Sequence, residues 1–559
     1  MAKHMRYSPR GSGYVRAGLG SLIVALVACP AQAYEYQFSN GVHVQFDNTI
    51  KYSVIERAAP ESSYFSDPGD GVFANNENDG DNNLRAGIVS NRVDLLTKLD
   101  VSDSGFGVDT TVYSWYDTVY NQETQQQPNA ITNNLNGEAN KFTSQTETQA
   151  GRNIELRNLF AYGSGSIAGT PVSLRVGRLV NIFGESLFFP TNGIAYGTAP
   201  VDAERELAVP NSQAKDLFLP TGQVLLTVQP TNSISVTAYY QFEWNYYNAP
   251  PAGSYFSPVD FEGEGAESLV VPSLLPYKIP RTSDIRGSNT GQFGIAIHYD
   301  PPTQNYDIGL YALQYNDSEP QVYLRNENKQ FGPVTVPFPG SYQLVYPDSI
   351  QIYGVSGSTT IGAVNFAGEV SARTNEPLVS GTSPGFAGFG GGIINIAPGE
   401  IANNTNAPAY AKGNTLHYQV SEVYLGGATP FWQGSSLLTE IAGDNLLGFT
   451  KNRQVFDRTY RHMALGLRTV FEADYFHVMP GLDVGIPIGL GWNFMGLAPD
   501  TNGFNSTGID RGGDITVGVK GTYHYVWTAG ISYTHYIAPP GRNLFADRSF
   551  AEFNVARTF

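Results

Sequence analysis

The chain has 559 residues, of which 13% are aromatic and only 15% are charged, and its net charge is −17. The excess of acidic residues argues against nucleic acid as a partner, because nucleic-acid binding needs a basic surface. Its single cysteine, Cys29, excludes a disulfide framework and a cysteine metal site. Many aromatic and few charged residues are typical of an outer-membrane barrel, whose lipid face and girdles are aromatic.

Residues 1–33 have the three parts of a secretory signal peptide. Basic residues precede an apolar run at 17–29, and the sequence AQA, ending at Ala33, matches the A-x-A cleavage pattern. The apolar run is too short to span a membrane. Cys29 also fits a lipoprotein cleavage box, so lipidation of this residue is the alternative to cleavage after Ala33. We expect the mature protein, residues 34–559, to be a single domain.

The strongest predicted strand covers residues 41–55. Apolar side chains such as Val42 and Val44 alternate there with polar ones such as His43 and Gln45. Alternation with period 2 predicts a strand that has one apolar and one polar face. The segment is also longer than the roughly 9–11 residues with which a tilted strand crosses a bilayer.

The same alternation recurs along the chain and gives about 18 candidate strands. The connections between them alternate in length: 230–232 and 300–305 are short, whereas 119–152 and 246–290 are long. Short periplasmic turns opposite long extracellular loops are typical of a transmembrane barrel. We therefore predict an all-β fold, a closed antiparallel transmembrane β-barrel of about 18 strands.

The remaining sequence agrees with a barrel in the outer membrane. After residue 33 no apolar run reaches the ~18 residues of a membrane helix, so the backbone can pair within the bilayer only in a closed barrel. The chain ends in an alternating segment whose last residue is Phe559. Such an end is similar to the strand that the barrel-assembly machinery recognises. An even strand number places both termini in the periplasm, and we expect contacts with membrane lipid and lipopolysaccharide.

The segment 75–83 is rich in Asn, Asp and Gly. Asp79 and Asp81 offer the oxygen ligands that calcium favours. The spacing is not that of an EF-hand, and no glutamate follows at the required distance. A solvated acidic loop is the first interpretation of this segment, and a calcium site at Asp79 and Asp81 is the second.

Strand parity places a set of ionisable side chains on the face of the lumen. They could form a selectivity lining, or they could pair with one another to satisfy a polar interior. The candidates are His43, Asp47, Lys51, Arg92, Asp94, Lys98, Glu155, Arg157, Arg175 and Arg178. Arg178 has the parity of the lipid face and follows Gly177, so we expect a bulge that turns it inward or a strand that ends at the membrane surface.

The connection 183–221 is the third long loop, and we predict that it folds into the barrel and narrows the pore. Its first part is apolar and its second part carries charges of both signs, whereas outer loops are usually polar. A loop of this kind needs a surface on which to pack, and the barrel interior is the nearest one. An external cap is the alternative. The candidate constriction residues are Glu185, Phe188, Phe189, Asp202, Glu204 and Arg205.

No pattern in the sequence indicates an enzyme or a cofactor. The histidines after residue 33 are scattered singly and show no metal-binding spacing. No G-x-S-x-G elbow occurs, and the triplet Gly184-Glu185-Ser186 is not one. We therefore expect a protein without catalytic activity and without a bound cofactor.

Five motifs follow one another in a specific order. They are NGVHVQFDNTIKYSV (40–54), GRLVNIFGES (177–186), PVD (200–202), YQFEW (240–244) and PPAGSYFSPVDFEGEG (250–265). In this order they resemble the domain-of-unknown-function 1302 family of Gram-negative outer-membrane barrels. The resemblance covers essentially the whole mature chain. It implies two partners, an inner-membrane pump of the resistance-nodulation-division class and a companion exported protein.

We predict that the protein is an outer-membrane channel for small molecules. The apolar third loop and inward tyrosines such as Tyr239, Tyr311 and Tyr315 favour a hydrophobic or aromatic solute. A general porin for polar solutes or ions is one alternative. A non-conducting accessory component of a transenvelope export system is another.

Overall fold

The computed structural model describes residues 34–66, 75–135, 137–210, 217–271, 277–381, 392–501 and 510–559. The predicted signal peptide, with Cys29, lies outside the described residues. The predicted third long loop is described except for residues 211–216.

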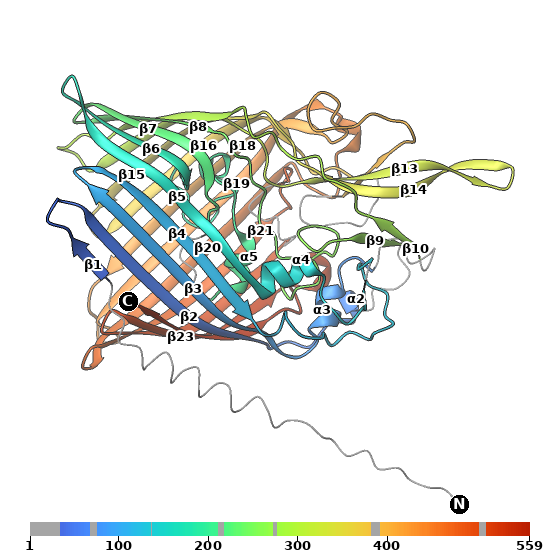
Figure 1. Cartoon of the computed structure of the whole chain (residues 1–559), viewed down its shortest axis with the longest axis horizontal. Helices are drawn as coiled ribbons and strands as arrows, with labels where there is room; N and C mark the ends of the chain where they lie inside the picture. Colours follow the sequence, from blue (N-terminus) through green and yellow to red (C-terminus); the bar gives the residue numbers. More distant parts are fainter. Residues whose placement is uncertain are drawn as a thin grey trace, which may run out of the picture.

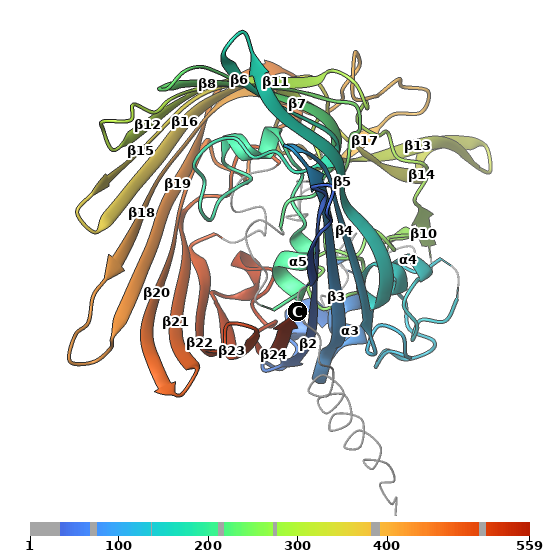
Figure 2. The ribbon, with the colours of Figure 1, turned by 60° about the vertical axis from the view of Figure 1, so that its left-hand side comes forward.

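Eighteen antiparallel strands of the described chain form a closed barrel (Figures 1 and 2). They are β2 (His43–Arg57), β3 (Gly87–Asp103), β4 (Phe106–Asp117), β5 (Arg152–Ile167), β6 (Thr170–Leu179), β7 (Thr221–Thr231), β8 (Ile234–Gln241), β11 (Gln292–Tyr299), β12 (Tyr306–Tyr315), β15 (Ile350–Ile361), β16 (Val364–Pro377), β18 (Lys412–Gly426), β19 (Gly434–Lys451), β20 (Met463–Met479), β21 (Leu482–Met495), β22 (Gly512–Tyr523), β23 (Trp527–Ile537) and β24 (Phe550–Thr558). Each strand pairs with the next in this order, and β24 closes the barrel on β2. The predicted fold class is confirmed.

A short additional strand, β1 (Tyr34–Gln37), lies at the seam of the barrel. It pairs with the first residues of β2, from His43 to Phe46, and β24 pairs with β2 from Thr49 onward. Between these two stretches, Asn48 and Phe559 exchange both backbone hydrogen bonds, at 2.7 and 2.8 Å. The terminal Phe559 is therefore part of the closing seam.

The outer wall of the barrel is apolar and uncovered. Leu174 and Val176 on β6 are 43% and 40% exposed, and Leu310 and Ile531 are 53% and 60% exposed. A soluble protein would bury a continuous surface of this kind, whereas a lipid bilayer solvates it. The barrel is therefore a transmembrane one. None of the described helices is long and apolar enough to cross a membrane.

The two ends of the barrel differ. At one end the strands are joined by short turns such as 104–105, 168–169 and 480–481. At the other end every connection is longer, and 180–220 and 242–291 are examples. Figure 1 shows the C-terminus at the first of these ends. We call them the short-turn end and the long-loop end.

The long connections contain their own secondary structure. Their elements are α2 (Ser63–Ser66), α3 (Asp79–Asn83), α4 (Ser144–Thr146), η1 (Glu147–Gly151), η2 (Ile194–Gly197), α5 (Ala203–Ala208), β9 (Ser268–Val271), β10 (Tyr277–Pro280), β13 (Gln321–Phe331), β14 (Val334–Val345), β17 (Ile393–Ile396), η5 (Arg453–Val455) and η6 (Pro540–Arg542). The hairpin of β13 and β14 extends away from the barrel in Figure 1. The sequence analysis assigned this hairpin to an unstructured connection, because its alternation gave no indication that the strands lie outside the wall.

Candidate functional site: the barrel interior

The chain between β6 and β7 enters the barrel, and Figure 2 shows α5 inside it. We call residues 180–210 the inward segment. Ile194 and Tyr196 of this segment are buried, and they pack on inner-wall side chains that include Leu225, Tyr239 and Tyr311. The lumen is thus partly occupied by the protein's own chain.

Glu440 on β19 holds the first part of the inward segment. Its carboxylate accepts hydrogen bonds from three consecutive backbone N–H groups, those of Leu187 (3.1 Å), Phe188 (2.5 Å) and Phe189 (3.1 Å). Hydrogen bonds to an ionised acceptor are about twice as strong as neutral ones. One side chain of the wall therefore fixes a full turn of the inward segment.

Two side chains of β16 hold the next part. The carboxylate of Glu369 accepts hydrogen bonds from the backbone N–H groups of Glu185 (2.6 Å) and Ile194 (2.8 Å). One nitrogen of the Arg373 guanidinium donates to the carbonyl oxygens of residues 191–193 at 2.9, 2.9 and 3.1 Å. Acceptors and donors of the wall thus match donors and acceptors of the segment.

The helix α5 is tied to the opposite wall. Asp202 caps the helix by accepting a hydrogen bond from the N–H of Arg205 (3.3 Å), and it also pairs with Arg157 of β5 at 2.8 Å. The Arg157 guanidinium donates a second hydrogen bond, to the carbonyl oxygen of Phe218 (3.0 Å). The inward segment therefore contacts both sides of the lumen.

A first cavity of about 450 Å³ lies between α5, the wall of β3 to β5, and connections of the long-loop end. Its lining includes Arg92, Tyr113, Trp115, Glu155, Arg178, Asp202, Glu204, Arg205, Tyr246 and Glu264. Burial raises the pKa of Glu204 to about 8, so this carboxyl is mostly neutral at pH 7. The first cavity is polar and carries charges of both signs.

A second cavity of about 380 Å³ lies on the other side of α5, against the wall of β20 to β24. Aromatic residues of its lining are Phe188, Phe189, Tyr247, Tyr536, Phe545 and Phe550. Arg468 and Asp514 add an ion pair at 3.2 Å. Asp202, Glu204 and Arg205 of the α5 region border the first cavity, whereas Ala203, Glu206 and Leu207 border the second. The helix is therefore the partition between them.

The predicted lumen residues divide into two groups by depth. Near the short-turn end the side chains are at least partly exposed, and His43 contacts Glu35 of β1 at 2.8 Å. This group is His43, Asp47, Lys98 and Arg175. Higher in the barrel, Arg92 and Asp94 form a buried ion pair at 2.8 Å. They satisfy each other, as the alternative interpretation of the lining expected.

Lys51 and Glu155 mark the boundary between these two groups. The ammonium of Lys51 donates to the carbonyl oxygen of Pro210 at 3.0 Å, at the end of the inward segment. Glu155 lies 3.6 Å from Arg157 and borders the first cavity. Both side chains thus face the inward segment from the wall.

The predicted constriction residues belong to the inward segment or to α5. Phe189 is buried, Phe188 is half-buried, and both line the second cavity. Glu185 is held through its backbone, as described above. The inward tyrosines Tyr239, Tyr311 and Tyr315 are buried against the segment. They therefore do not line an open passage, and the clue to an aromatic solute drawn from them does not hold.

Arg178 stands at the rim of the barrel. The expected bulge at Gly177 is wrong: β5 and β6 stay in register there, with Leu159 opposite Arg178. The strand ends one residue later, at Leu179. The Arg178 guanidinium donates to the carbonyl oxygen of Pro220 (3.3 Å) and borders the first cavity from the rim.

Gly177 itself has a conformation and a neighbourhood that exclude a side chain. Its φ is +137°, and a Cβ atom there would lie 2.4 Å from the carbonyl oxygen of Leu159. We expect Gly177→Ala to destabilise the barrel by about 2 kcal/mol or more. The measurement is the temperature at which the folded band is lost in heat-shift electrophoresis. Gly165→Ala is the control, because nothing lies within 4 Å of its Cβ position, and an equal effect of both variants would contradict the steric explanation.

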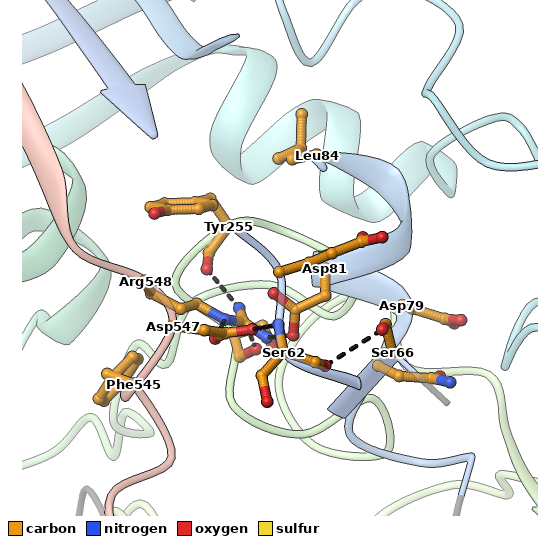
Figure 3. Close-up of polar contacts among 12 residues, drawn as sticks. Ser62, Ser66, Asp79, Asp81, Leu84, Tyr255, Phe545, Asp547 and Arg548 are labelled. Carbon is orange, nitrogen blue, oxygen red and sulfur yellow. Dashed lines mark hydrogen bonds and ion pairs between the residues drawn. The ribbon is translucent and has the colours of Figure 1, made fainter. Parts of the chain in front are cut away.

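The calcium site considered at Asp79 and Asp81 does not form. Both carboxylate oxygens of Asp81 are taken by guanidinium groups, those of Arg57 (3.0 Å) and Arg548 (2.7 Å), as Figure 3 shows for Arg548. Asp79 accepts a hydrogen bond from the N–H of Asn133 at 2.8 Å. Two cations already neutralise Asp81, so this carboxylate has no charge left for calcium.

Strand pairing, apolar outer wall and occupied lumen together define a transmembrane β-barrel protein. The chain belongs to the family described as "Protein of unknown function (DUF1302)", whose model matches residues 15–559. The resemblance found in the sequence is thereby confirmed. A search of curated proteins finds no match.

Among solved structures the chain is similar to outer-membrane proteins at low identity. OccAB4 of Acinetobacter baumannii is 10% identical, with a TM-score of 0.43 over 95% of this chain and 100% of that one. A BenF-like porin of Pseudomonas fluorescens Pf-5 is 9% identical, with a TM-score of 0.40 over 92% and 98%. OpdK of Pseudomonas aeruginosa, solved with vanillate, is 8% identical, with a TM-score of 0.38 over 92% and 98%. TM-scores below 0.5 transfer no solute to this chain.

Proposed function

We propose that the protein is an outer-membrane channel for small molecules and that it favours hydrophobic or aromatic solutes. The observation that carries this proposal is the second cavity, because aromatic side chains of the inward segment and of the wall converge there. Sites for small molecules are commonly concave and largely apolar, with few polar groups that fix orientation. The short-turn end then faces the periplasm, which is the usual orientation of such barrels.

The chemistry of the second cavity suits a flat, amphipathic solute. Phe188 and Phe189 present ring surfaces from the inward segment, and Phe550 does so from β24. The ion pair of Arg468 and Asp514 can receive a polar substituent at the same place. Ring contacts of this kind contribute about 0.5–1.5 kcal/mol each beyond the area they bury. The first cavity, which is polar, provides no comparable preference.

The test compares two zwitterionic solutes, L-phenylalanine and L-asparagine, in a swelling assay with proteoliposomes. We expect wild-type protein to admit phenylalanine faster than its size alone would allow. Phe188→Ala removes a half-buried ring from the second cavity. The loss of one ring contact worth ~1 kcal/mol lowers the ratio of the two rates roughly fivefold.

The matched control is Phe553→Ala, because Phe553 is 39% exposed on the outer wall. It should leave the ratio unchanged. Equal entry of both solutes into wild-type liposomes would favour the general polar porin instead. An identical loss in both variants would show that the second cavity does not select the solute.

A second candidate, the non-conducting accessory component, has one observation in its favour. Connections of the long-loop end contribute fully buried side chains, among them Tyr255, Phe256, Val259 and Phe261. A closed end of this kind suits a protein that docks other components, such as the pump and the exported protein that the family resemblance implies. Folded wild-type protein that gives no current in planar bilayers would support this candidate.

A further inference from the structure

Five buried carboxylates gather inside the long-loop end of the barrel. Their residues are 0–2% exposed, and they are Asp317, Glu319, Glu376, Asp444 and Asp500. They come from the end of β16, from β19, and from the connections that follow β12 and β21. We call them the acidic cluster. No motif in the sequence indicated it, because its members are far apart along the chain.

The positive charge near the acidic cluster is too small to balance it. Arg373 lies 3.3 Å from Glu376, and Lys412 acts on Glu376 and Asp317 from further away. Within the described part of the chain, these two cations face five carboxylates. Part of the Arg373 guanidinium is also committed to the carbonyl oxygens of residues 191–193. The cluster therefore has an excess of negative charge in a buried place.

The carboxylate oxygens give a second, independent indication. Both oxygens of Asp444, of Asp500 and of Glu319 are buried and find no hydrogen-bond donor among the described residues. A buried ionised carboxylate without donors or a counter-ion is unfavourable by several kcal/mol. Such groups in a folded protein are usually paired or bind a metal ion.

Three side chains of this region have the geometry of a metal site. Glu376, His417 and Asp500 each offer one ligand atom, and these atoms lie within 4.8 Å of one another. Asp444 stands opposite His417 in the pairing of β18 with β19, and its carboxylate lies against that of Asp500. Carboxylate oxygens and one imidazole are ligands that divalent cations accept.

His417 is oriented as a metal ligand would be. Its Nδ1 lies 2.9 Å from the amide oxygen of Asn192, which can only accept, so Nδ1 carries the hydrogen. Nε2 is then the nitrogen with the lone pair, and it now accepts from the hydroxyl of Thr415 at 2.8 Å. A second hydrogen bond that fixes the tautomer is common among metal-binding histidines. Thr415 would have to turn aside for a metal ion to bind.

We propose that Glu376, His417 and Asp500 bind a divalent cation, with Asp444 as a fourth ligand. The cation links β16, β18 and β19 to the connection that follows β21. It lies next to Asn192 of the inward segment, so it also stabilises the position of that segment. The site is separate from the second cavity and does not depend on the proposed transport of solutes.

The test measures bound metal in detergent-solubilised protein. Wild-type protein is dialysed against Ca²⁺, Mn²⁺ or Zn²⁺ separately, then against metal-free buffer, and analysed by elemental mass spectrometry. We expect about one equivalent of one of these ions per chain, and a loss of most of it in Asp500→Asn and Asp444→Asn. His417→Gln distinguishes the ions, because it should weaken Mn²⁺ or Zn²⁺ strongly and Ca²⁺ little.

Asp117→Asn is the matched control. Asp117 is equally buried, but its oxygens accept hydrogen bonds from Ser90, Asn91 and Val119, so this variant should keep the metal. If the cluster variants fail to fold, wild-type protein remains testable: removal of the ion by EDTA should lower the unfolding temperature by about 5 °C, and the bound ion should restore it. Folded wild-type protein that retains none of the three ions and is insensitive to EDTA would overturn the proposal.

Discussion

Barrels in which Glu369 and Glu440 are both replaced by alanine should show at least a roughly twofold higher single-channel conductance than wild type, because an 18-stranded barrel without an inward segment leaves an aqueous channel. The two carboxylates accept five backbone hydrogen bonds from the inward segment. Hydrogen bonds to a charged group contribute about 1.5–3 kcal/mol each. Without them the segment loses its attachment to β16 and β19. Planar-bilayer recordings give the conductance.

Two further variants complete this experiment. Glu422→Ala removes a carboxylate from β18 at a position opposite Phe366, toward the short-turn end, and it should leave the conductance at the wild-type value. Deletion of residues 187–209 should raise the conductance as the double replacement does. If neither the double replacement nor the deletion changes it, the inward segment does not restrict the passage.

The barrel could be predicted from the sequence because each of its strands records its own environment. In β2 the apolar parity faces lipid and the polar parity faces the lumen, so the alternation is readable residue by residue. The hairpin of β13 and β14 also alternates, yet it lies outside the wall. Local pattern gives the strand but does not say which sheet the strand joins.

The candidate site could be predicted only in part. The apolar start of the inward segment indicated that it packs on something, but its partners Glu369 and Glu440 follow more than 170 residues later. Glu369 did carry a weak indication: its neighbours on the adjoining strands are Ser356 and Gln419, so no basic side chain of the wall is placed to pair with it. An inward acid without a partner in the wall requires one from elsewhere.

Parity failed at the rim, where it ceases to define a side chain's surroundings. Arg178 has the parity of Leu159, which faces lipid, yet it borders the first cavity because the strand ends beside it. Tyr311 has the parity of the lumen, yet it is covered by the inward segment. Both outcomes depend on where the chain goes after the strand, which no local pattern specifies.

The second large effect is expected at the buried ion network in Figure 3. Arg548 pairs with Asp81 at 2.7 Å and donates to the carbonyl oxygen of Ser257 at 2.9 Å, and Asp81 also pairs with Arg57. The charged ends of these side chains are at most 1% exposed. The network joins the first long connection to the chain just before β24, so it fastens the two ends of the barrel sequence together.

Replacing Arg548 with alanine should lower the free energy of unfolding by about 3–5 kcal/mol, because it leaves a buried carboxylate with one partner fewer. Urea unfolding of the barrel in detergent micelles or lipid vesicles measures this loss. Arg175→Ala removes an exposed arginine from the lumen and should change stability by no more than about 0.5 kcal/mol.

A double-mutant cycle separates the ion pair from simple loss of packing. Asp81→Asn in the background of Arg548→Ala should cost far less than Asp81→Asn alone, because the charge left without its partner is then removed as well. If the two losses are instead additive, Arg548 stabilises the barrel through its contacts with Tyr255 and Ser257 rather than through its charge. In that case the long connections at this end are joined mainly by packing, and the excess negative charge of the acidic cluster becomes the more consequential electrostatic feature of the molecule.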